Sequence, residues 1–115
     1  MRINSDLWVK AYLRRCSSEG VSAVVVRRGD ADAGVVFIKI SRLDGTATLF
    51  GPAAAGLARD EMDRRWSVSI ARSPEAVIDA RLAQERKLDP DVWVVEVEDR
   101  EGRHFLDDWL DNTSS

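Results

Sequence analysis

The strongest constraint on the fold is a seven-residue, valine-rich stretch, Val92 to Glu98, directly after the turn at Asp89–Pro90–Asp91. Neighbouring side chains of a strand point to opposite faces. One predicted face is entirely apolar and consists of Trp93, Val95 and Val97. The other face begins with Val92 and Val94 and ends with Glu96 and Glu98. This pattern predicts a strand that is buried on both faces at its start and has one face exposed to solvent at its acidic end.

Two helices are expected, one before the first strand and one directly before the Val92–Glu98 strand. The first begins at Ser5 or Asp6 as N-cap and ends at Gly20. The second begins with Ser73 as N-cap and Pro74 in its first turn, and it ends near residue 88. The buried stripe of the first helix is predicted to contain Val9, Leu13 and Cys16.

Four more strands precede the second helix. They are predicted at Val21–Val26, Val35–Ile40, Thr46–Phe50 and Trp66–Ile70, the last with Trp66, Val68 and Ile70 inward. The Asp44–Gly45 dipeptide is a hairpin signal, so the first three strands are expected to run antiparallel in succession. Residues 57–64 fit either a short helix or an irregular segment.

The predicted fold is α+β, with the element order α-β-β-β-β-α-β. Four or five mostly antiparallel strands form the sheet, and the two helices are expected on one face of it. The strand after the second helix has the option of pairing in parallel with a central strand, which would make the sheet mixed. Residues 1–111 are predicted to form a single domain, followed by a disordered polar tail at 112–115.

Composition and charge narrow the class of protein. The chain has 115 residues, of which 44% are hydrophobic, and it lacks a signal-like N-terminus or an apolar run of membrane-spanning length. Cys16 is the only cysteine, so a cytoplasmic location is expected. Net charge is +4 over residues 1–43 and −7 over residues 44–115. An overall acidic chain disfavours nucleic-acid binding.

Three segments resemble a known family. They are the run Asp89–Phe105, the Arg27–Asp30 loop and the opening Trp8–Arg15. Together they are similar to domain-of-unknown-function family 1491, a group of short alphaproteobacterial proteins. The resemblance implies a small intracellular bacterial protein, and it transfers no activity and no catalytic residue.

Residues that could carry chemistry do not form a recognised motif. His104 is the only histidine, and a hairpin contact is favoured over a nucleophile system with Cys16. Glu96 and Glu98 share a strand face, and Asp30 or Asp32 would have to join them to hold a divalent cation. A solvated strand end paired to Arg103 is the preferred interpretation.

The element order also resembles the core of restriction-endonuclease-like nucleases. That core needs an acid two residues before a strand lysine, but Phe37 stands two residues before Lys39. The departure weakens a nuclease hypothesis. The Arg27–Asp30 loop likewise lacks the phosphate-binding glycine pattern, so a charged loop is preferred there. Trp66 and Trp93 are expected in the core, and Trp109 is expected to be exposed or at an interface.

The leading functional hypothesis is a non-enzymatic protein-interaction module or homodimer. Its predicted interaction surface contains Glu96, Glu98, Arg103, His104, Asp107, Asp108 and Trp109. One alternative is a metal-dependent hydrolase or nuclease that uses the strand-end carboxylates. Another is nucleic-acid binding through a basic patch of Arg14, Arg15, Arg27 and Arg28. No catalytic residue, metal site, cofactor or membrane contact is assigned.

Overall fold

The computed structural model describes residues 4–53 and 64–111. Its elements are α1 (Ser5–Ser18), β1 (Ser22–Arg27), β2 (Val36–Ser41), β3 (Thr46–Pro52), β4 (Trp66–Pro74), α2 (Glu75–Leu88), β5 (Trp93–Glu98) and the 3₁₀ turn η2 (Asp107–Trp109). The α+β class and the predicted order of helices and strands are confirmed. The predictions for residues 57–63 and 112–115 lie outside the described residues.

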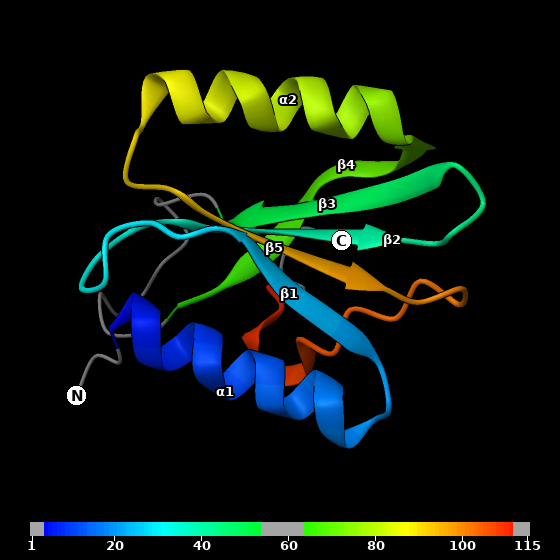
Figure 1. Cartoon of the computed structure of the whole chain (residues 1–115), viewed down its shortest axis with the longest axis horizontal. Helices are drawn as coiled ribbons and strands as arrows, with labels where there is room; N and C mark the ends of the chain where they lie inside the picture. Colours follow the sequence, from blue (N-terminus) through cyan, green and yellow to red (C-terminus); the bar gives the residue numbers. More distant parts are fainter. Residues whose placement is uncertain (1–3, 54–63, 112–115) are drawn as a thin grey trace.

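The five strands form one mixed sheet in the order β1-β5-β2-β3-β4 (Figure 1). β5 pairs in parallel with β2 and antiparallel with β1, so the parallel option is confirmed. The predicted Asp44–Gly45 hairpin is confirmed, because β2 and β3 pair antiparallel. The expectation that β1 pairs with β2 is wrong, because β5 lies between them. A strand with apolar residues on both faces is most stable in the middle of a sheet, and β5 is such a strand.

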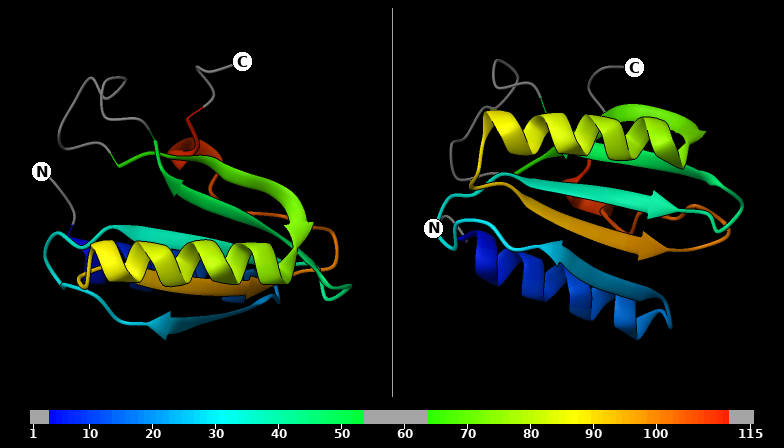
Figure 2. Two further views of the ribbon diagram at one scale, coloured as in Figure 1. Left: turned by 90° about the horizontal axis from the view of Figure 1, so that it is seen from above. Right: turned by 45° about the horizontal axis from the view of Figure 1, so that its top comes forward.

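The two helices cover opposite faces of the sheet, which corrects the expectation that they share one face (Figures 1 and 2). All six residues of β2 are buried. Their alternation sends Ile38 and Ile40 toward α1, while Phe37 packs with Ile78 and Leu82 of α2. A central strand that is apolar on both faces needs cover on both, and one helix supplies each.

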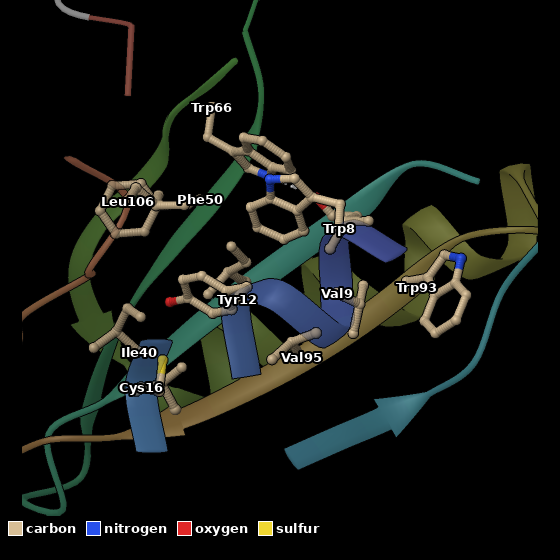
Figure 3. Close-up of a cluster of buried hydrophobic side chains, with 13 residues drawn as sticks. Trp8, Val9, Tyr12, Cys16, Ile40, Phe50, Trp66, Trp93, Val95 and Leu106 are labelled. Carbon is tan, nitrogen blue, oxygen red and sulfur yellow. Dashed lines mark hydrogen bonds between the residues drawn. The ribbon is translucent and has the colours of Figure 1, made fainter. Parts of the chain in front are cut away.

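Aromatic side chains dominate the core under α1. The Trp8 ring stacks on Trp66 of β4, with ring centroids 4.0 Å apart, and on Tyr12, at 5.1 Å (Figure 3). The Trp66 indole N–H also donates a hydrogen bond of 2.9 Å to the carbonyl of Val36. Stacking and hydrogen bonding together tie α1, β2 and β4. The burial of Trp66 and Trp93 confirms that both are core residues.

A bulge in β4 changes which side its residues face. Phe50 pairs with Val68, whereas the adjacent Leu49 pairs with Ile70, so the register shifts between them. Trp66 consequently packs under α1 and Ile70 on the α2 side, while Val68 is 51% exposed. The prediction that all three β4 residues point inward is wrong, because the extra residue reverses the alternation.

Both helix starts differ from the predicted caps. The Asn4 side chain accepts a hydrogen bond of 2.9 Å from the Leu7 N–H and is the N-cap of α1. The Ser5 hydroxyl instead donates to the carbonyl of Gly34 at 2.6 Å, inside the protein. At α2, the strand β4 runs up to the helix, and the Ser73 hydroxyl bonds to the carbonyl of Ala71 rather than capping the helix.

The loop between β1 and β2 passes very close to the backbone of Asp91, just before β5 begins. A Cβ atom built on Gly34 would lie 2.5 Å from the carbonyl oxygen of Asp91 and 2.8 Å from that of Asp30. A Cβ on Gly29 would lie 2.1 Å from the same Asp91 oxygen. Only glycine permits this approach, which lets the loop step over β5 from β1 to β2.

We expect Gly34→Ala to lower the free energy of unfolding by about 1–3 kcal/mol, because the added methyl group meets backbone atoms that cannot rotate away. Urea denaturation of the purified protein measures the change. Ala33→Ser, at the neighbouring exposed position, is the control and should stay within about 0.5 kcal/mol of wild type. Equal stability of Gly34→Ala and wild type would contradict the close approach.

Candidate functional site

A shallow, open cleft of about 450 Å³ lies where the parallel strands β2 and β5 end. The turn from α1 into β1 forms one wall, and the β2–β3 turn and the segment after β5 form the others. Figure 1 shows these three segments at the same end of the sheet. The lining residues are Glu19, Gly20, Val21, Ser22, Leu43, Glu98, Asp99, Arg100, Glu101 and Arg103. The carboxyl ends of parallel strands are a common place for binding sites in mixed sheets.

Asp99 and Arg103 hold the segment after β5 in place. The two carboxylate oxygens of Asp99 each accept a hydrogen bond of 3.0 Å from the Arg103 guanidinium, and one also accepts the Arg103 backbone N–H at 2.8 Å. These bonds lower the pKa of the Asp99 carboxyl and raise the pKa of Arg103. The pair is therefore a structural clamp for the cleft.

The rest of the cleft is apolar and, on balance, acidic: its three glutamates outnumber one exposed arginine, Arg100. Glu19, Glu98 and Glu101 are exposed, and the Glu101 carboxylate lies 3.5 Å from the Arg103 side chain. Leu43 is 45% exposed and has a φ of 63°, in the left-handed region that leucine rarely adopts. An apolar side chain is thus held in a strained turn beside carboxylates, a combination suited to a ligand that is both cationic and partly apolar.

Glu96 lies away from the cleft, in a charged cluster under α2. The Lys39 ammonium lies 2.9 Å from Glu75, 2.8 Å from Asp79 and 3.7 Å from Glu96. Burial opposes the charge on Lys39, but the hydrogen bonds to Asp79 and Glu75 outweigh it and raise the pKa of this lysine. Lys39 is therefore a charged anchor between β2 and α2.

His104 faces the core under α1. Its ring packs edge-on against Phe50, with centroids 5.3 Å apart, and its carbonyl accepts the Tyr12 hydroxyl at 2.6 Å. The ring Nδ1 accepts the backbone N–H of Leu106 at 2.9 Å, which requires the unprotonated form at that nitrogen. Burial lowers the pKa of His104, although Asp107 opposes the shift. The histidine therefore supports the chain path after β5.

The last predicted surface residues dock on α1. The Arg15 guanidinium lies 3.6 Å from Asp107, 4.0 Å from Asp108 and 3.9 Å from the centre of the Trp109 ring. Trp109 also meets Trp8 edge-on at 5.0 Å. The tryptophan expected to be exposed or at an interface is half-buried within this chain, because Arg15 and Trp8 both cover it.

The four arginines of the predicted basic patch lie in two places. Arg14 and Arg15 belong to the last turns of α1. Arg28 instead pairs with Asp6 in the first turn of α1 at 3.1 Å and lies over the Trp93 ring, and Arg27 donates to the carbonyl of Pro90 at 2.7 Å. The helix separates the two pairs, so the four side chains do not form one contiguous surface.

The residues considered for metal or nucleophile chemistry also lie apart. The Asp30 carboxylate accepts the Ala33 N–H at 2.9 Å, inside the loop that carries Asp32, far along the sheet from Glu98. Across residues 4–53 and 64–111, no group of three or more His, Cys, Asp or Glu side chains is placed to hold a metal ion. Cys16 is buried, and burial raises the pKa of its thiol.

The family model described as "Protein of unknown function (DUF1491)" matches residues 3–107. The chain belongs to the DUF1491 family. A crystal structure of a DUF1491 family protein from Caulobacter crescentus is 40% identical, with a TM-score of 0.80 over 97% of this chain and 100% of the other. An NMR structure of a DUF1491 family protein from the same organism is 41% identical, with a TM-score of 0.79 over 97% and 99%.

A third solved structure extends the comparison to a second organism. The solution structure of a protein from A. tumefaciens is 38% identical, with a TM-score of 0.75 over 85% of this chain and 86% of the other. These relatives come from alphaproteobacteria, as the resemblance implied. No curated protein matches the chain. In the part of this DUF1491 protein that the structure describes, no helix has the length and apolarity to cross a membrane.

The sequence pattern indicated two cleft residues, Glu98 and Arg103, and gave no sign of Glu19, Val21 and Leu43. The missed residues come from turns that are distant in the sequence. Glu98 of β5 pairs with Ser41 of β2 on one side and with Ser22 of β1 on the other, and these pairings bring the turns together. These residues could have been predicted only from the order of the strands in the sheet, which the sequence pattern does not give.

We expect acid to destabilise the protein through His104. Its folded pKa lies below the ordinary value of 6.5, so the unfolded chain takes up a proton first, and stability falls as pH drops from about 6.5 toward the folded pKa. Asn at this position keeps an acceptor for the Leu106 N–H but does not titrate. Urea denaturation from about pH 7.5 to about pH 5, above most carboxylate titration, should show a steeper loss for wild type than for His104→Asn. Identical slopes would contradict the prediction.

Proposed function

We propose that this chain is a non-enzymatic protein-interaction module, and that its cleft binds a basic, partly apolar segment of a partner protein. The carrying observation is the cleft itself: at the ends of β2 and β5, three exposed glutamates outnumber Arg100, the one exposed arginine outside the Asp99–Arg103 clamp, and lie beside the strained, exposed Leu43. A lysine or arginine side chain has a cationic head for carboxylates and an apolar stem for leucine and valine.

Rigid support favours this role for the cleft. The Asp99–Arg103 clamp uses two charged residues to fix one wall, and the Asp99 N–H donates to the Ser41 carbonyl at 2.9 Å. A preformed wall lowers the cost of ordering a loop on binding. The same geometry gives little support to the hydrolase alternative, since Glu96 and His104 face other parts of the protein.

A cytoplasmic location belongs to the same proposal. Cys16 is buried in the core under α1 with the Tyr12 ring beside it. A single buried thiol cannot form a disulfide within the chain, and this is the usual pattern of proteins that function in a reducing compartment.

Nuclear magnetic resonance titration tests the cleft. The probe is a five-residue peptide that alternates arginine and leucine, and the matched probe replaces each arginine with glutamate. We expect the basic peptide to shift the backbone signals of Glu19–Ser22 and Glu98–Arg103 and the acidic peptide to shift none of them. The double variant Glu19→Lys, Glu101→Lys should weaken binding by about tenfold or more, because it reverses two of the cleft charges.

The control variant carries the same change of net charge at the other end of the sheet. Asp32→Lys, Asp91→Lys alters two exposed carboxylates outside the cleft and should leave peptide affinity within about twofold of wild type. If both double variants lose affinity equally, binding depends on overall charge and the proposed cleft site is excluded. An absence of shifts in wild type excludes it as well.

A further inference from the structure

The outer edge of β1 is a second surface suited to an interaction. β5 pairs with one side of β1, and no other described strand pairs with β1. Its outer side therefore presents backbone N–H and C=O groups that can pair with another strand. Along this edge Val24, Val25 and Val26 are 54%, 37% and 57% exposed. Figure 2 shows β1 at the margin of the sheet, beyond β5.

The other edge of the sheet is protected by comparison. β4 contains two register shifts, carries Arg72 and ends at Pro74, which has no N–H to donate. β1 has a single shift, between Val25 and Arg27, and its ladder with β5 is regular from Ser22 to Val25. Bulges, proline and charge are the usual devices that block edge pairing. β1 is the edge with fewer of them.

The two ends of β1 carry opposite charges. Arg27 and Arg28 lie at its C-terminal end. Glu19 precedes its N-terminal end, and Glu98 pairs with Ser22, its first residue. In an antiparallel pair of two identical strands, the basic end of each strand lies beside the acidic end of the other. The edge is therefore complementary to itself in charge as well as in backbone geometry.

We propose that β1 pairs antiparallel with β1 of a second copy of this chain, so that the two sheets join across a two-fold axis. The pairing supplies backbone hydrogen bonds to both outer edges and covers the exposed valines. With Val24 opposite the partner's Val24, Arg27 lies opposite the partner's Ser22, and the partner's Glu98 is on the next strand, β5, beside it. The Arg27 guanidinium exchanges its bond to the Pro90 carbonyl for this carboxylate, twice per dimer. This interface goes beyond the peptide-binding role of the cleft but shares Glu19, Ser22 and Glu98 with it. Molecular mass is therefore measured without peptide, so that its result is separate from peptide affinity.

Light scattering with size-exclusion chromatography measures the mass. Wild type should have twice the chain mass of 12.9 kDa. Val24→Lys should dissociate about tenfold more readily, because like charges then face each other across the two-fold axis. The matched control is Val68→Lys, a valine of similar exposure, 51%, on the opposite edge strand, and it should remain dimeric.

Two charge-reversal variants distinguish loss of strand pairing from misfolding as the cause of a monomeric variant. Arg27→Glu and Glu98→Arg should each be monomeric alone, because each sets like charges together. An equal mixture of the two variants should form a heterodimer. In it the two introduced side chains have opposite charges and meet at one contact, while the native arginine and glutamate meet at the other. A misfolded variant would not recover on mixing.

Four results would overturn the proposal. They are a monomeric wild type at millimolar concentration, an open-ended polymer, a mixture of the two charge variants that stays monomeric, and a monomeric Val68→Lys. The first and third would show that the β1 edges do not pair. The polymer would show a contact without a closing two-fold axis, and the last would place the interface on the opposite edge strand.

Discussion

The parallel pairing of β5 with β2 determines the arrangement of the other elements. It places the two most apolar strands side by side at the centre of the sheet, from the Val36–Trp93 pair to the Ser41–Glu98 pair. Because both strands are apolar on both faces, a helix is needed on each side. The same pairing moves β1 to an edge and brings the ends of β2 and β5 together, where the cleft opens.

Much of the fold follows from local pattern. The alternation in Val92–Glu98, the helical stripe of α1 and the Asp44–Gly45 turn each specify their own element, and each is present. The side of the sheet taken by α2 is not a local property, since that helix buries only Ile78 and Leu82 and either face offers apolar partners. The bulge in β4 is equally hidden, because the sequence there alternates without interruption.

The site was only partly predictable for a related reason. Period-two alternation correctly places Glu96 and Glu98 on one face. It does not predict that Lys39 of the neighbouring strand pairs with Glu96 and leaves Glu98 exposed. Charge content suggested that Arg103 would pair with a strand glutamate, whereas it pairs with Asp99, four residues away in the turn. Sequence spacing identifies which side chains share a face, and strand order decides which neighbours they meet.

The central position of β5 has a consequence for biosynthesis. Ser22, near the start of the chain, pairs with Glu98, near its end. During translation β1 emerges early and stays without its neighbour until β5 has left the ribosome, so both of its edges are open for most of that time. Long-range pairing of this kind slows folding and exposes strands to association. The valine-rich β1 therefore stays open to association with other chains until β5 arrives.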